Sequence, residues 1–257
     1  LKLCISLSII GVIVTQVDWH TCLATLKKGD VLLLSIAFIL LWVERAWAVI
    51  KWNFLLRTQG TVISWWTLFF IYNIGAFWGL FLPSSLSTDV VRGYYLSKNI
   101  QNMEMSAASV VVDRMMGLFS LLFLCLISIG VYSSKLQSSI ITHVVISSLF
   151  FLVLAVAVHL EAIPDLLEKK IPFFTTHTLG KKLIGMHRAF LKFKKYPGIL
   201  ICSFFFSLVL QVIRVVTIYI TACAFAINAD IVTFFIVVPI TVIIIMIPIS
   251  VGGLGVR

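Results

Sequence analysis

Five charged side chains that fall within or beside long apolar stretches are the residues of this chain most able to do chemistry. They are Asp89, Arg92, Asp113, Arg114 and Arg214. Arg214 is the clearest case, because neither Ile199–Ile213 nor Val215–Ala229 contains a charged residue. An arginine at the centre of a membrane helix costs about 2.5–3.5 kcal/mol on insertion scales, so its side chain is expected to face the interior of a bundle. Because a guanidinium group binds phosphate through two parallel hydrogen bonds, these residues favour the binding of a phosphate-bearing group.

Helical spacing indicates which polar side chains share a face. Gln211 precedes Arg214 by three residues, and Asp89 precedes Arg92 by three, so each pair lies on one face if its segment is helical. We therefore expect these side chains to line one substrate-binding site together with other polar residues near the same depth. The predicted substrate-binding residues are Asn73, Ser84, Ser85, Asp89, Arg92, Asp113, Arg114, Gln211, Arg214, Ser250 and Arg257.

The same charges also have a purely structural interpretation. Asp113 and Arg114 are neighbours in the chain, so they point about 100° apart on a helix and each needs a partner elsewhere. For Arg214 the structural alternative is an ion pair with a carboxylate, and Asp89 and Asp113 are the candidates near membrane depth. The sequence leaves both the functional and the structural role open.

The stretch FLPSSLSTDVVRGYYLSK, from Phe81 to Lys98, interrupts an apolar run. Pro83 is expected to end one helix, because proline cannot continue the hydrogen-bond ladder. The hydroxyl groups and Asp89 are expected to cap a second, short helix, since their oxygens accept hydrogen bonds from free backbone N–H groups. Irregular backbone at membrane depth is tolerated only where protein or a wet cavity surrounds it. We therefore predict a broken or re-entrant helix here.

A similar pattern occurs a second time. PSSLSTDVVR (Pro83–Arg92) aligns with PISVGGLGVR (Pro248–Arg257), with proline first and arginine last in both. The predicted helix-break residues are Pro83, Pro248, Gly252, Gly253 and Gly255. Two interrupted helices of this kind predict inverted repeats, which in transporters mark a binding site near the midplane of the membrane. The alternative is coincidence between two proline-broken helix ends.

The composition sets the class of protein. Of the 257 residues, 61% are hydrophobic and 12% are charged, whereas soluble domains have about 25% charged residues. Apolar runs of about 20 residues predict membrane-spanning helices. The predicted spans are Leu3–Val17, Val31–Ile50, Val62–Leu82, Ala107–Tyr132, Ile140–Leu160, Ile199–Ala226 and Ile231–Val251. The sequence therefore predicts an all-α, polytopic membrane helix bundle with about seven long spans plus one broken short helix.

The basic residues predict an orientation, because Lys and Arg accumulate on the cytoplasmic side of a membrane protein. Residues 161–197 form a basic, amphipathic segment that is expected to lie on the cytoplasmic surface; the alternative is an ordinary solvated loop. Lys51 and Arg57 are placed on the same side as this segment, and so is the N-terminus. Both ends, at Leu1 and Arg257, are interpreted as the cut ends of a fragment of a longer protein, with a single domain over residues 1–257.

No catalytic or metal-binding motif is found in the sequence. The five cysteines and five histidines form no C-x-x-C or H-E-x-x-H pattern, and no glycine-rich loop that would hold a phosphate is present. No catalytic residue, metal or cofactor is therefore predicted.

Three motifs in order, FLPSSLSTDVVRGYYLSK, AASVVVDRMMGL (Ala107–Leu118) and PISVGGLGVR, resemble the lysylphosphatidylglycerol synthase transmembrane region, a flippase-like family of integral membrane proteins. RTQG at Arg57–Gly60, with the preceding Arg45, fits the same pattern. The resemblance covers nearly the whole chain. In one departure, Ser87 and Thr88 stand where the family commonly has two glycines before the aspartate. The family also usually continues beyond the position of Arg257 with an acidic residue and further helices.

The resemblance implies movement of a lipid or lipid-linked head group between the leaflets of a prokaryotic plasma membrane. The implied substrate is an anionic phospholipid, an aminoacylated phospholipid or a polyprenyl-phosphate-linked carrier. Membrane lipids are the expected partners, together with a lipid synthase or glycosyltransferase, and no nucleic acid is expected. The alternatives are a membrane component of a glycosyl- or aminoacyl-transferase system that modifies lipid, an ion-coupled transporter of a soluble solute, and a scaffold subunit.

Overall fold

The computed structural model of the chain describes residues 19–81, 87–132, 191, 193 and 196–246. Within these ranges every regular element is an α-helix, which confirms the all-α prediction. The helices are α2 (Trp19–Lys28), α3 (Val31–Arg57), α4 (Trp65–Phe81), α5 (Ser87–Ile100), α6 (Met103–Tyr132), α11 (Pro197–Ala224) and α12 (Ile231–Met246).

Three of the described helices are long and apolar enough to cross a membrane, namely α3, α6 over Met103–Ser128, and α11. The prediction of about seven long spans therefore exceeds what the described residues show. Helices α4 and α12 are apolar but contain only 17 and 16 residues. The predicted spans Leu3–Val17 and Ile140–Leu160 lie outside the described residues, as does most of the basic segment 161–197.

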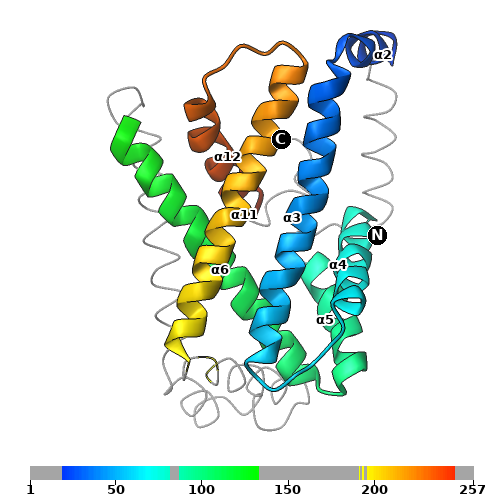
Figure 1. The fold of residues 1–257 in the computed structure, drawn as a ribbon, viewed down its shortest axis with the longest axis vertical. Helices are drawn as coiled ribbons and strands as arrows, with labels where there is room; N and C mark the ends of the chain where they lie inside the picture. The colour runs from blue at the N-terminus through cyan, green and yellow to red at the C-terminus, as the bar shows by residue number, and fades with distance from the viewer. Residues whose placement is uncertain (1–18, 82–86, 133–190, 192, 194–195, 247–257) are drawn as a thin grey trace, which may run out of the picture.

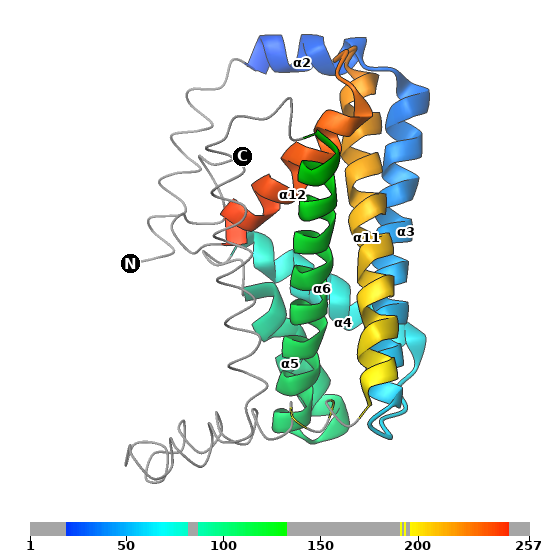
Figure 2. The same cartoon turned by 90° about the vertical axis from the view of Figure 1, so that its left-hand side faces the viewer.

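The bundle is organised around two long helices that lie side by side. Helices α3 and α11 pack along each other, α6 crosses them at an angle, and α12 packs against α6 and α11 (Figure 1). Helices α4 and α5 form a hairpin that packs on α3 and α6. Figure 2 shows this hairpin in the half of the bundle that also holds the C-terminal end of α3 and the N-terminal end of α6. Helices α4 and α5 thus lie side by side in one half of the bundle, and neither runs its full length.

Small residues let the two arms of the hairpin approach each other closely. A Cβ atom on Gly75 would lie 2.9 Å from the carbonyl oxygen of Thr88, and the Thr88 hydroxyl occupies the place that a Cβ on Gly79 would take. Glycines spaced four apart commonly allow this approach between membrane helices. The contact holds the first turn of α5, which carries Asp89, against α4.

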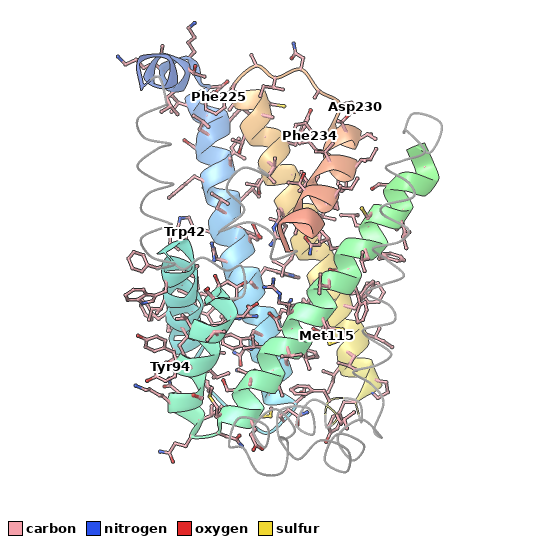
Figure 3. The ribbon with its side chains drawn as sticks, turned by 180° about the vertical axis from the view of Figure 1, so that it is seen from behind. Trp42, Tyr94, Met115, Phe225, Asp230 and Phe234 are labelled. Carbon is pink, nitrogen blue, oxygen red and sulfur yellow. The ribbon has the colours of Figure 1, made fainter. Side chains whose placement is uncertain are left out.

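The N-terminal end of α3 is fixed by Asp30. Its carboxylate accepts hydrogen bonds from the backbone N–H groups of Leu32 at 2.8 Å and Leu33 at 3.2 Å, which would otherwise lack partners at a helix start. The backbone N–H of Asp30 donates to the carbonyl of Ala224 at 2.9 Å and so ties α3 to the end of α11. Figure 3 places Phe225 at this junction.

A proline inside α12 leaves one carbonyl without its helical donor. Pro239 has no N–H, so the carbonyl oxygen of Phe235 loses the usual hydrogen bond from four residues ahead. The Ser128 hydroxyl, which comes from α6, lies 3.0 Å from that oxygen and 2.8 Å from the Leu124 carbonyl oxygen of its own helix, so the two carbonyls share its single proton. This bond satisfies a backbone group that lipid cannot and joins α6 to α12.

Candidate functional site

The centre of the bundle contains a buried ion-pair cluster built on Asp113 of α6. Lys51 Nζ, from α3, lies 2.8 Å from Asp113 Oδ1, and Arg92 Nη2, from α5, lies 2.8 Å from Asp113 Oδ2. Lys51 also donates to the Ser207 hydroxyl of α11 at 3.0 Å. The side chain of Arg92 is 4% exposed and that of Asp113 is 8% exposed. Charged groups from three helices and a hydroxyl group from a fourth therefore meet where water barely reaches.

Arg92 is held by ion pairs and by aromatic contacts. Its Nη2 atom lies 2.9 Å from Asp89 Oδ1, which confirms that these two residues share a face of one helix. Its guanidinium carbon lies 5.1 Å from the ring centre of Trp52 and 5.4 Å from that of Tyr72. Such cation–π contacts stabilise a desolvated guanidinium group. Arg92 is thus the link between the Asp113 cluster and Asp89.

Asp89 bridges two arginines. Its second carboxylate oxygen pairs with Arg114 Nη1 of α6, so the chain of ion pairs runs from Lys51 through Asp113, Arg92 and Asp89 to Arg114. The side chain of Arg114 is 22% exposed, well above Arg92. The prediction that Asp113 and Arg114 pair with partners elsewhere in the chain is confirmed.

Arg214 pairs with Glu44 of α3, and not with Asp89 or Asp113. Its Nη2 atom lies 2.7 Å from Glu44 Oε1, and its Nε atom lies 3.1 Å from the same oxygen. The two aspartates that the sequence offered as candidates are already taken up by other cations. Gln211 accepts from Arg214 Nη1 at 3.0 Å, which confirms that these two side chains share a face.

A polar cavity of about 260 Å³ lies among these residues. The charged residues that line it are Lys51, Asp89, Arg92, Asp113, Arg114 and Arg214, so four cationic groups face two carboxylates. A second polar cavity of about 330 Å³ lies between α3, α4 and α11 and is lined by Glu44, Arg45 and Arg214. Arg214 and Tyr72 line both cavities. The arrangement can hold an anionic group inside the bundle.

The structure brings together six of the predicted site residues and leaves one aside. Asp89, Arg92, Asp113, Arg114, Gln211 and Arg214 all line the first cavity. Asn73 lies on α4, and its amide donates to the Phe69 carbonyl of its own helix at 2.8 Å. It is not among the described residues that line these two polar cavities, and its place in the substrate-binding site stays a prediction.

The remaining predicted site and helix-break residues lie outside the described residues. These are Pro83, Ser84, Ser85, Pro248, Ser250, Gly252, Gly253, Gly255 and Arg257. The second copy of the repeat falls in this part of the chain, so the inverted repeat stays a prediction. In the described ranges, no three His, Cys, Asp or Glu side chains gather in a way that would hold a metal ion.

Sequence reasoning missed two residues of the site. Lys51 was assigned to the cytoplasmic surface, but α3 continues to Arg57 and Lys51 is 4% exposed inside the bundle. Glu44 was overlooked although it is the only acidic residue of the predicted span Val31–Ile50. The argument that turned Arg214 inward applies equally to Glu44, because an ionised carboxylate in an apolar helix also needs a partner.

Comparison with known families agrees with this architecture. The family described as Lysylphosphatidylglycerol synthase TM region matches residues 1–257, the whole sequence. The chain belongs to the lysylphosphatidylglycerol synthase transmembrane-region family. A search of curated proteins and a search of solved structures each found no match to the chain.

Membership in the lysylphosphatidylglycerol synthase transmembrane-region family makes the chain a membrane component with a lipid-related function. The three long apolar helices place it in a membrane. Thr88, one of the two residues that depart from the family's glycines, is the residue packed against Gly75 and Gly79. The threonine side chain fits there because Gly75 and Gly79 of α4 have no side chains.

Proposed function

We propose that this chain moves an anionic phospholipid, an aminoacylated phospholipid or a polyprenyl-phosphate-linked carrier between the leaflets of a membrane. The observation that carries the proposal is the polar cavity inside the bundle, where four cationic side chains face two carboxylates. Even with Glu44 counted against Arg214, one positive charge remains in excess. A phosphate group that enters the cavity would balance this charge, and the apolar chains of the lipid would stay in the bilayer.

The burial of each arginine side chain indicates whether it can exchange its carboxylate partner for a phosphate. Arg92 contacts two carboxylates and two aromatic rings and is 4% exposed, so its charge is already balanced inside the bundle, although its buried Nε atom has no hydrogen-bond partner. Arg114 has one carboxylate partner in this cluster and is 22% exposed, and Arg214 is 35% exposed. An arginine at the edge of a cavity can replace a carboxylate by a phosphate of similar geometry. We therefore assign phosphate binding to Arg114 and Arg214.

The buried group of Lys51, Arg92 and Asp113 has a supporting role in this proposal. Removing one member of a buried ion pair leaves an uncompensated charge and costs about 3–5 kcal/mol. The group therefore holds α3, α5 and α6 in one arrangement. The cavity edge, with Asp89 and Glu44 as exchangeable counter-ions, is where the substrate binds.

The proposed location is the plasma membrane of a prokaryote, with the chain crossing it several times and the N-terminus in the cytoplasm. Lys27 and Lys28 end α2, whereas Arg57 and Lys98 lie in the last turns of α3 and α5. Figures 1 and 2 place α2 at one end of the bundle and the C-terminal ends of α3 and α5 at the other. Membrane lipids are the proposed partners, and a lipid synthase or glycosyltransferase is the proposed source of the lipid.

The test is lipid movement by the purified chain in vesicles. The chain is reconstituted with fluorescent phosphatidylglycerol, and a membrane-impermeant reductant quenches the label in the outer leaflet. We expect quenching to proceed beyond the outer leaflet with the protein present. Arg114→Gln and Arg214→Gln should each reduce this movement severalfold, and Arg114→Lys should restore part of it because the charge survives.

Arg57→Gln is the matched control, since Arg57 is exposed at the end of α3 and away from both cavities. It should move lipid as well as the unmodified chain. If the unmodified chain moves no lipid, the proposal is wrong and the alternative of a membrane component in a lipid-modifying glycosyl- or aminoacyl-transferase system is favoured. If the control loses as much activity as Arg114→Gln, the assignment of Arg114 is wrong.

A further inference from the structure

We infer that the apolar groove between α5 and α6 holds one hydrocarbon chain of the lipid whose phosphate binds Arg114. The inference rests on the proposed function, because it names the place where the apolar part of the same substrate leaves the polar cavity. The groove has a volume of about 420 Å³ and lies between the two helices that carry Asp89 and Arg114.

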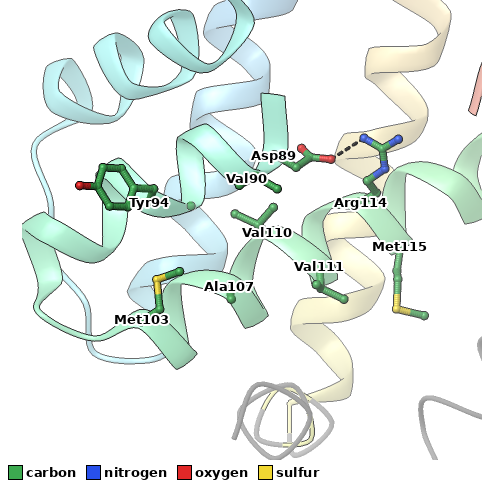
Figure 4. A pocket seen from close by; sticks show the side chains of 10 residues that line it. Asp89, Val90, Tyr94, Met103, Ala107, Val110, Val111, Arg114 and Met115 are labelled. Carbon is green, nitrogen blue, oxygen red and sulfur yellow. Dashed lines mark hydrogen bonds and ion pairs between the residues drawn. The ribbon is translucent and has the colours of Figure 1, made fainter. Parts of the chain in front are cut away.

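The lining of the groove is apolar except at one end. Val90, Ala107, Val110 and Val111 form its walls, and Met115 extends it along α6 (Figure 4). The Asp89–Arg114 ion pair stands at the inner end, and Tyr94 and Met103 stand at the other (Figure 4). An occupant must therefore be apolar over most of its length and carry a charged group at one end.

The Asp89–Arg114 ion pair lies between the apolar groove and the polar cavity. Asp89 and Arg114 line the apolar groove and also line the polar cavity. They thus stand where the two spaces meet. A phosphate that displaces Asp89 from Arg114 would occupy the polar side, with its attached chain directed into the groove. The polar backbone of a peptide would find no hydrogen-bond partner along these walls, and a free phosphate would leave the groove empty.

The groove is open to the side and long enough for a lipid chain. Val90 is 68% exposed, and Tyr94 and Met103 are also exposed, so the groove opens at the side of the bundle. From Met103 to Met115 the helix α6 advances about 18 Å at 1.5 Å per residue. This length is close to half of a hydrocarbon core of about 30 Å, which is the space filled by the chains of one leaflet.

The experiment is cross-linking from the end of the lipid chain. The full chain is reconstituted with phosphatidylglycerol that carries a diazirine at the tip of one acyl chain, and cross-linked peptides are mapped by mass spectrometry after illumination. We expect the cross-links to concentrate on 94 and 103–107, because the tip of the chain lies at the end of the groove away from the ion pair. Unlabelled phosphatidylglycerol should compete for these sites. Diacylglycerol with the same diazirine should label them severalfold less, because it lacks the phosphate.

Val90→Trp should fill the mouth of the groove and reduce its cross-links severalfold. Val131→Trp is the matched control, because Val131 is 65% exposed on α6 and lies outside the groove lining. Ala107→Leu narrows the groove from the α6 wall and should also reduce the cross-links severalfold. It replaces Val90→Trp as the test if Val90→Trp folds poorly. Equal labelling of both lipids, or cross-links spread evenly over the lipid-facing surface, would overturn the inference.

The outcomes separate this inference from the proposed function. Cross-linking measures binding and needs no transport. Phosphate-dependent labelling of the groove in a protein that moves no lipid would support the groove and overturn the proposed function. Lipid movement without labelling in the groove would support the proposed function and overturn the inference about the groove.

Discussion

Lys51 Nζ lies 2.8 Å from Asp113 Oδ1, and both side chains are buried where α3, α6 and α11 meet. Asp113 also accepts from Arg92, so one carboxylate neutralises part of two cations. Because the surrounding helices are apolar, each of these charges depends on the other for its place in the bundle. The pair therefore offers the most direct test of how the bundle is held together.

Replacement of Asp113 by Asn should destabilise the protein more than replacement of Lys51 by Met. The first change leaves two buried cations without their shared counter-ion, which should lower the free energy of unfolding by about 3–5 kcal/mol. The second change leaves Asp113 paired with Arg92, so its cost should be smaller. Equilibrium unfolding in detergent measures both, and the double variant should lose less than the sum. Lys28→Met, at the exposed end of α2, should be neutral. Equal losses of unfolding free energy for Lys28→Met and Lys51→Met would contradict the role of the ion-pair cluster in stability.

Asp89 and Arg92 should prove energetically coupled. Asp89→Asn removes the charge between Arg92 and Arg114, and Arg92→Gln removes the link from Asp89 to Asp113. Each change should impair stability, and the double variant should be milder than the two effects added. A double-mutant cycle on unfolding decides the matter. Strict additivity, with a harmless Asp89→Asn, would show that Asp89 only caps α5.

Arg214 should be needed for lipid movement even when its stabilising role is removed. Arg214→Leu leaves Glu44 unpaired in the bundle and should lower stability. Glu44→Gln combined with Arg214→Leu removes both charges and should recover the stability of the unmodified chain. The double variant should still move lipid poorly, since the phosphate contact of Arg214 is gone. A double variant that is fully active in the vesicle assay would reduce Arg214 to the structural partner of Glu44.

Ser128→Ala should loosen the contact between α6 and α12. The Phe235 carbonyl would then lack both its helical donor, because of Pro239, and the Ser128 hydroxyl. An unsatisfied buried group of this kind costs about 1–3 kcal/mol. Ser120→Ala is the control, because Ser120 donates to the Gly117 carbonyl of its own helix. Thermal unfolding should show a clear drop in Tm for Ser128→Ala alone, and equal drops would refute the role of the proline.

The hairpin of α4 and α5 predicts which residues share a side of the membrane. In a chain with its native cysteines replaced, single cysteines at Arg57 and Lys98 should react with an impermeant maleimide from the same side. A cysteine at Lys28 should react only from the opposite side. Labelling of Arg57→Cys and Lys98→Cys from opposite sides would show that the interrupted segment crosses the membrane.

The sequence by itself determined the class of fold and the relationships within each helix. An uncharged stretch on both sides of Arg214 required a polar interior, and a spacing of three residues placed Gln211 beside Arg214 and Asp89 beside Arg92. These relationships depend only on the helical period and on the cost of a charge in an apolar medium, which any sequence displays directly. The interruption after Phe81 and the short helix that follows it are visible for the same reason.

Only the tertiary structure decided which helix supplies each partner. Arg214 binds Glu44, which lies 170 residues away, and the buried Lys51 takes one oxygen of Asp113. The helical period states which side chains share a face, but the rotation of each helix and the choice of its neighbours come from packing over the whole bundle. Close contact of Thr88 with Gly75 and Gly79 sets α5 against α4, and this contact depends on three uncharged residues. The positions of Arg114 and Arg214 at the cavity edge, and of Arg92 in its buried centre, follow from that packing.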